Sequence, residues 1–148
     1  MSAGSAKNKE RPSLPRQASP QSRAGAAGRA PRRLSTHQQA VLIQVLAAFR
    51  HETVGVCYLP SVSDALNYAE GFSTIFRAIN WTVDPAERVE PLPESSSGLA
   101  IVVPEGKVPS SAEALRDALR IYGLEAEIVS DQWNLCGARN FVLAITKA

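Results

Sequence analysis

The sequence predicts an α/β fold, a three-layer-like sandwich in which a mixed five-stranded sheet is combined with three helices. Three short apolar runs carry this prediction: Val54–Leu59, Leu99–Val103 and Phe141–Ile145. The run at 99–103 stands between Gly98 and Pro104, is too short for an ordinary helix, and lacks the polar alternation of a half-exposed strand. We therefore expect the three runs to form the centre of a sheet that is covered on both faces, with helices on the outside.

The first 33 residues differ from the rest of the chain in composition and charge. They hold eight Lys and Arg against one Glu, a net charge of +7, whereas residues 34–148 hold eight basic and 13 acidic residues, a net charge of −5. This N-terminal stretch is rich in Ser, Ala, Gly, Pro and Arg, and Leu14 is its only large aliphatic residue. Because so little apolar surface cannot offset the entropy of ordering the chain, we expect a disordered basic tail over residues 1–33 and one α/β domain over residues 34–148.

Two uses are open for the basic tail. It is either a solubilising segment or an arm that contacts an anionic surface, nucleic acid or lipid. The tail contains no aromatic residue on which bases could stack.

The cysteines and the hydropathy pattern indicate a cytoplasmic protein. Cys57 and Cys136 form neither a Cys-x-x-Cys pair nor a cluster with histidine, so no disulfide framework, metal site or cofactor is predicted. No apolar stretch approaches the roughly 20 residues of a transmembrane helix.

Helical spacing of apolar side chains predicts three helices, over about residues 35–50, 61–80 and 110–123. Ser35 is the expected cap of the first helix. The second and third start at sequences typical of capping boxes, Ser61–Asp64 and Ser110–Glu113, and Gly123 is a suitable end for the third.

Two further strands complete the sheet. Trp81–Val83 is short and Leu124–Val129 alternates with charge, so both suit edges, and residues 88–92 of the acidic loop 84–97 could add a short edge strand. With the five strands numbered in chain order, we favour the order 2-1-3-5-4, with parallel crossovers and an antiparallel last strand. The runner-up, 2-1-3-4-5, would leave a very apolar strand on an edge.

This topology predicts a ligand site beyond the carboxyl ends of the first and third strands. Two helix N-termini would point into that crevice and favour an anion or a nucleotide. The candidate ligand-binding residues are Ser61, Ser63, Asp64, Lys107, Ser110 and Ser111. Against this hypothesis, acidic residues already occupy the expected capping positions, and no glycine-rich phosphate loop follows a strand.

The first helix is the favoured functional surface, because it is apolar around more than half its circumference. An exposed surplus would mark a partner surface or a dimer seam. The residues concerned are Val41, Leu42, Ile43, Val45, Leu46 and Phe49.

No catalytic residue is predicted. A nucleophilic Cys57 would need His37 or His51 beside it, and the glutamates of the loop 84–97 have no apolar shelter that would shift their pKa values.

The pattern of core residues over about residues 34–147 resembles a group of uncharacterised bacterial α/β domains, which in many members follow membrane-spanning helices. The motifs that carry the resemblance are Leu34-Ser35-x-x-Gln38, Asp64-Ala65-x-x-Tyr68-Ala69-x-x-Phe72, Gly98-Leu-x-Ile-x-Val103 and Leu143-x-Ile145-x-Lys147. The present chain has a basic tail where those helices would stand. The resemblance implies the same fold and brings no catalytic residue with it.

These observations predict an interaction or regulatory module that binds a partner protein, or a second copy of itself, through its first helix, its tail or both. The alternative is a domain that binds a small anionic ligand, or an enzyme, that uses the crevice beyond the first and third strands.

Overall fold

The computed structural model describes residues 30–90, 92 and 97–147. The chain divides into two units between Pro31 and Arg32, and all helices and strands of the described residues belong to the second. The predicted disorder of the N-terminal tail falls, up to residue 29, outside the described residues. The folded unit begins at Arg32, two residues earlier than the predicted boundary, because this side chain is bound to the domain as described below.

Three helices form where the apolar spacing predicts them: α1 (Thr36–Leu46), α2 (Ala65–Ala78) and α3 (Ser110–Ile121). The predicted cap of α1 is confirmed, because Ser35 Oγ accepts the N–H of Gln38 at 3.0 Å and the Gln38 side chain accepts the N–H of Ser35 at 2.8 Å. The two predicted capping boxes are wrong. The N-cap residues of α2 and α3 are Asp64 and Pro109, and neither makes a side-chain capping bond.

One mixed sheet contains all the strands that the described residues form, in the order β2-β1-β6-β4-β5, with β3 pairing to β1 beside β2. The parallel pairings of β1 with β2 and of β4 with β5 are the expected ones. The bounds of the strands are β1 (Thr53–Tyr58), β2 (Thr82–Val83), β3 (Glu87–Arg88), β4 (Leu99–Val103), β5 (Glu127–Ser130) and β6 (Phe141–Ile145).

The favoured order 2-1-3-5-4 is wrong in the position of the last strand. β6 lies between β1 and β4, where Leu143 is the register partner of both Val56 and Ile101, instead of between β4 and β5. All five residues of β6 are buried, so its best neighbours are the two other apolar strands and not the partly charged β5. β6 is antiparallel to β4, as predicted, but parallel to β1, so β1 and β4 run in opposite directions.

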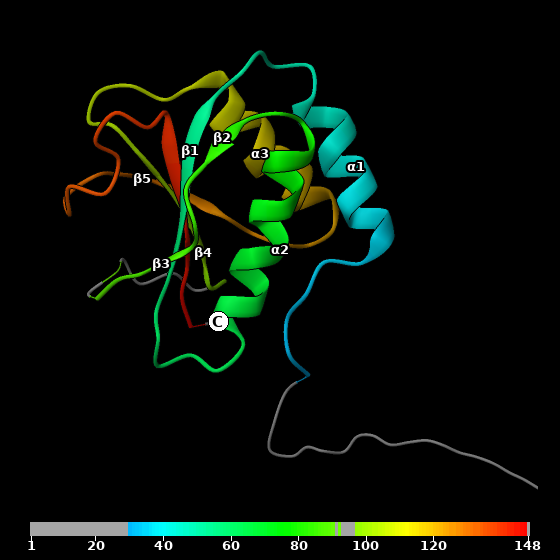
Figure 1. Ribbon diagram of the computed structural model, residues 1–148, viewed down its shortest axis with the longest axis horizontal. Coiled ribbons are helices and arrows are strands. Elements are labelled where there is room, and N and C mark those ends of the chain that lie inside the picture. The colour runs from blue at the N-terminus through cyan, green and yellow to red at the C-terminus, as the bar shows by residue number, and fades with distance from the viewer. Residues whose placement is uncertain (1–29, 91, 93–96, 148) are drawn as a thin grey trace, which may run out of the picture. The chain divides into compact units, whose positions relative to one another are not determined.

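The sheet is covered differently on its two faces. All three helices lie on one side of it, with α1 packed against α2 and α3 (Figure 1). The other face is covered by loops. The loop residues that pack against this face are Val89, Leu92, Trp133, Leu135 and Cys136. The third layer of the sandwich therefore consists of loops and not of helices.

A single carboxylate shapes the loop between β5 and β6. Asp131 accepts backbone N–H groups of Trp133, Leu135 and Cys136 at 2.9–3.1 Å. Desolvation opposes the charge of Asp131, but these hydrogen bonds outweigh it and lower the pKa of the carboxyl group. The loop is thus held in the curved form that covers the sheet.

Within the described ranges, no helix combines the length and apolarity needed to cross a bilayer.

The central position of β6 gives a stability prediction. Leu143 is fully buried between two apolar strands, so Leu143→Ala should lower the free energy of unfolding by about 2–5 kcal/mol. The control is Ile121→Ala, at a side chain that is 74% exposed, which should cost less than about 0.5 kcal/mol. Urea denaturation measures both, and similar costs for the two variants would contradict this placement of the core.

Candidate functional site

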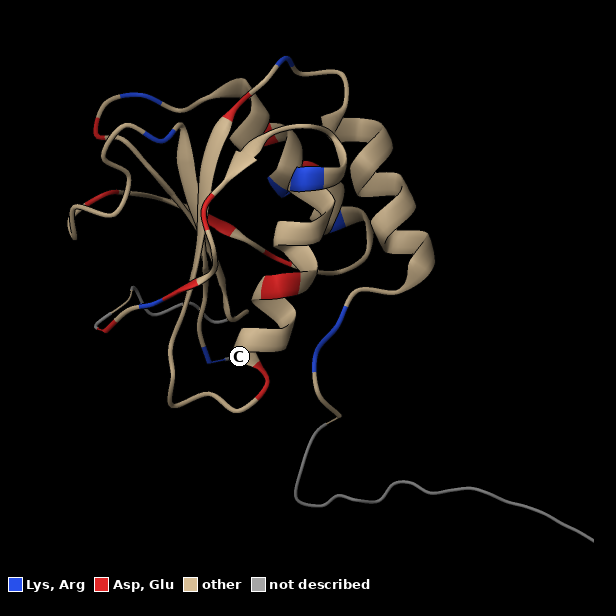
Figure 2. Ribbon diagram, in the orientation of Figure 1, with Lys and Arg blue, Asp and Glu red and all other residues tan. Residues whose placement is uncertain are grey.

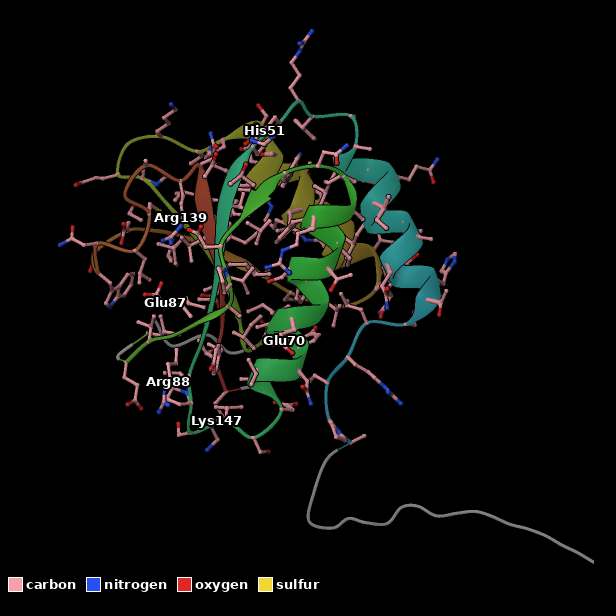
Figure 3. The ribbon with its side chains drawn as sticks, viewed as in Figure 1. His51, Glu70, Glu87, Arg88, Arg139 and Lys147 are labelled. Carbon is pink, nitrogen blue, oxygen red and sulfur yellow. The ribbon has the colours of Figure 1, made fainter. Side chains whose placement is uncertain are left out.

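The predicted crevice beyond β1 and β4 does not form. β6 lies between β1 and β4, which run in opposite directions. The carboxyl ends of β1 and β4 therefore lie at opposite ends of the sheet, measured along its strands. Ser111 Oγ donates to Glu52 Oε1 at 2.8 Å, and Glu52 stands just before β1, at the end of that strand opposite to Ser61. Figure 3 shows the same separation, with His51 beside the start of β1 and Lys147 beyond the end of β6.

The predicted ligand residues are therefore divided between two places. The residues that follow β1 lie at one end of the strands, whereas the residues that follow β4 lie at the other end. The first set is Ser61, Ser63 and Asp64, and the second is Lys107, Ser110 and Ser111.

The apolar surplus of α1 is largely packed. Leu42 and Leu46 are buried in the core, and three of the other predicted interaction residues are partly buried against it. Those three are Ile43, Val45 and Phe49, while Val41 is half-buried. The helix carries no charged residue along its length (Figure 2).

The cysteine and histidine side chains are not assembled for catalysis. His51 contacts the Asn80 carbonyl oxygen at 2.8 Å and Thr82 Oγ1 at 2.7 Å, whereas His37 packs edge-to-face on Tyr122. Cys57 belongs instead to the cluster on the loop-covered face of the sheet.

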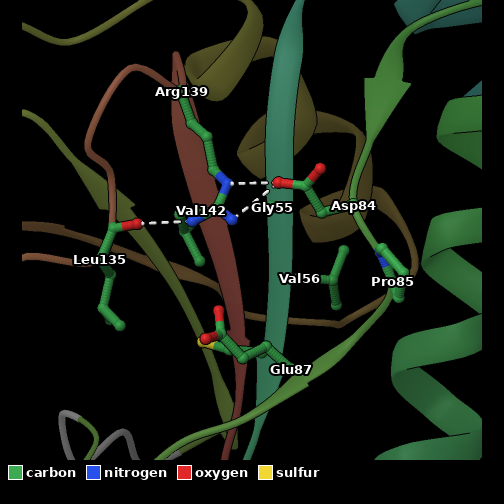
Figure 4. Close-up of a pocket in the computed structure, with 9 residues that line it drawn as sticks. Gly55, Val56, Asp84, Pro85, Glu87, Leu135, Arg139 and Val142 are labelled. Atoms are coloured by element: carbon green, nitrogen blue, oxygen red, sulfur yellow. Dashed lines mark hydrogen bonds and ion pairs between the residues drawn. The ribbon is translucent and has the colours of Figure 1, made fainter.

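A small polar cavity lies beside Cys57 on that face (Figure 4). The Arg139 guanidinium crosses it, binding Asp84 Oδ2 at 2.7 Å and donating to the Leu135 carbonyl oxygen at 2.8 Å. A Cβ on Gly55 would lie 2.9 Å from Arg139 Cδ, so any other residue here would require the arginine side chain to shift. The remaining volume is about 10 Å³, which is about the space of one water molecule and too small for a ligand.

Both thiols are held in their neutral form. Burial, followed by the Glu87 charge, raises the pKa of Cys57 to about 12, and burial, followed by the Asp131 charge, raises the pKa of Cys136 to about 12. Cys136 Sγ also donates to the Val102 carbonyl oxygen at 3.3 Å. The reactive thiolate is therefore scarce at neutral pH.

We expect neither thiol to be alkylated by iodoacetamide in the folded protein at pH 8, because both are buried and protonated. Both should react once urea unfolds the chain. Mass spectrometry of the labelled protein measures this, and rapid labelling of either cysteine without urea would contradict the described burial.

Arg32 fastens the segment just before α1, residues 32–35, to the end of the sheet. Its guanidinium contacts both oxygens of Asp64 at 2.9 and 3.1 Å, and its backbone N–H donates to the same carboxylate at 2.8 Å. The guanidinium also donates to the Thr146 carbonyl oxygen at 2.9 Å, and it lies 5.1 Å from the centre of the Tyr68 ring. We call this set of contacts the Arg32 clasp.

The clasp brings the segment before α1 alongside α2, and a groove of about 430 Å³ lies between them. The apolar side chains of the groove are those of the largely buried Leu34 and Tyr68, and Gly71 lines it without a side chain. The remaining groups are polar and none is acidic: Arg33, Ser35, Thr36, Gln39 and Asn67.

The sequence did not predict the clasp or the groove. Arg32 and Arg33 share the composition of the basic tail, so nothing local marks them as part of the domain. One usable signal was present: Gly71 stands in the middle of a strongly amphipathic helix, where glycine is unfavourable.

Comparison of the chain with models of known protein families, with curated proteins and with solved structures finds no match. The resemblance to bacterial α/β domains therefore stays a prediction, and the site must be interpreted from its own geometry.

The clasp predicts a pH-dependent contribution to stability. The hydrogen bonds from Arg32 lower the pKa of Asp64 below its ordinary 3.8, so the contribution is complete above about pH 4 and is lost as the pH falls through the lowered pKa. Asp64→Asn should lower the free energy of unfolding by about 1–2 kcal/mol at pH 7, with the difference from wild type shrinking at lower pH.

The matched control is Asp117→Asn, whose carboxylate is 58% exposed and pairs with Arg116 on the surface of α3. This change should cost less than about 0.5 kcal/mol at either pH. Urea denaturation at pH 7 and pH 3 measures both variants. A cost of Asp64→Asn that does not depend on pH would contradict the proposed role of the carboxylate.

Proposed function

We propose that the folded unit is a protein-interaction module that binds an extended acidic segment of a partner protein in the groove between the start of α1 and α2. The observation that carries the proposal is the groove itself: about 430 Å³ of open volume with an apolar base and polar walls. A hollow of this volume can accept part of a peptide, and polar residues of this kind form the rim of protein–protein contacts.

The charge of the groove supports an acidic occupant. Arg33 is the only charged residue that lines it, and within the described residues its guanidinium has no acidic partner. The first turn of α1, which lies at the same place, contains no acidic residue, so its own sequence does not complement the positive end of the helix dipole. A carboxylate of a partner would therefore meet a cation and a helix N-terminus together.

The polar side chains of the groove suit a peptide backbone. Within the described part of the chain, the Asn67 side chain makes no hydrogen bond, so it can both donate to and accept from an extended peptide. The sequence that precedes Arg33 adds long-range attraction, because residues 1–32 carry a net charge of +6. Charge of this kind increases association rates with an acidic partner.

The proposal is tested by fluorescence anisotropy with a fluorescein-labelled dodecapeptide of alternating Glu and Ser, and the full chain. We expect Arg33→Ala to weaken binding by about tenfold, the value of one charge-assisted hydrogen bond. Two controls remove the same charge elsewhere: Arg29→Ala in the preceding basic sequence, and Arg77→Ala at the end of α2, which is exposed. Each should change the affinity less than about twofold.

Equal losses for the three arginine variants would contradict the proposal, because the peptide would then bind to net positive charge and not to the groove. Tighter binding of single-stranded DNA or of phosphatidylserine vesicles, unaffected by Arg33→Ala, would also contradict it and would support the basic tail as the binding element.

A further inference from the structure

Gly71 occupies a position where the fold itself gives no reason for glycine. It stands in the middle of α2, and its backbone does not adopt the positive φ that favours glycine. Glycine is among the least favourable residues in a helix interior, since it has the most backbone freedom to lose. A Cβ built on Gly71 meets no atom within 4 Å, whereas one on Gly55 would collide with Arg139 at 2.9 Å.

The space above Gly71 belongs to the groove. Gly71 lines it together with Leu34 and Tyr68, which are 7% and 3% exposed and form its apolar base. Asn67 stands one helical turn before Gly71, on the same face of α2, and Arg33 lies on the opposite side, in the segment before α1. A bare patch of helix is thus bordered by an amide on one side and a guanidinium on the other.

We infer that this gap receives one apolar side chain, of about the size of leucine, from the acidic segment of the partner, and that Gly71 thereby determines which segments bind. This inference rests on the proposed function and adds to it a sequence preference, in which an apolar anchor is flanked by acidic residues. A side chain at position 71 would fill the same volume from the protein's own side.

The test compares two acidic dodecapeptides that differ at one central residue, Leu in the first and Ala in the second. The wild-type chain should bind the Leu peptide about tenfold more tightly, because the additional methyl and methylene groups leave water. Gly71→Leu should abolish this preference. The matched control is Ala78→Leu, which adds the same bulk at an exposed position near the end of α2, and it should preserve the preference.

Gly71→Ala provides a second measurement that does not require a ligand. Because a methyl group at this position meets open space, the substitution should raise the melting temperature by about 2–6 °C through helix propensity alone. A lower melting temperature would show that the space is not free, and would overturn the inference.

The two proposals fail differently. Equal affinity for the Leu and Ala peptides, with the dependence on Arg33 intact, would overturn the anchor inference and leave the proposed function standing. Weak binding of both peptides without any dependence on Arg33 would overturn both.

Discussion

The insertion of β6 between β1 and β4 is the constraint on which the rest of the structure depends. Each of the three strands is almost wholly apolar, so each needs neighbours on both edges and cover on both faces. Pairing β6 to both of the others satisfies this need, with Leu143 opposite Val56 on one side and Ile101 on the other. The helices then cover one face of the sheet and the loops around Arg139 and Asp131 cover the other.

The same insertion determines which grooves the described residues form. The carboxyl ends of β1 and β4 therefore lie at opposite ends of the sheet, so the two helix N-termini that follow these strands do not share a crevice. The insertion also brings the Thr146 carbonyl oxygen, just after β6, within reach of Arg32. The clasp that forms there fixes the segment before α1 alongside α2, and the groove between them follows from that contact.

The sequence was most informative about local structure. Leu99–Val103 and Phe141–Ile145 form strands with the predicted bounds, and Gly123 has the positive φ of 75° expected after α3. Helix starts were less predictable, because the Asp64 carboxylate binds Arg32, 32 residues away, instead of capping α2. Such a choice depends on the tertiary partner, which no local pattern contains.

Strand order and the candidate site were beyond local patterns for the same reason. The apolar sequence of β6 indicates that this strand is central, but it does not indicate which strands are its neighbours. The ligand residues predicted from the assumed strand order therefore lie at opposite ends of the sheet. The predicted partner surface on α1 was overestimated because Leu42 and Leu46 face the core. Gly71 was a local departure from the regular pattern of its helix, and it lies in the groove.

The most direct test of this account is the pattern of nuclear Overhauser effects between the strands of the ¹⁵N,¹³C-labelled protein. The structure predicts that backbone protons of Leu143 show contacts with those of both Val56 and Ile101, parallel on the first side and antiparallel on the second. Contacts of Leu143 with β5, together with direct contacts between Val56 and Ile101, would contradict it, because β1 and β4 would then be neighbours.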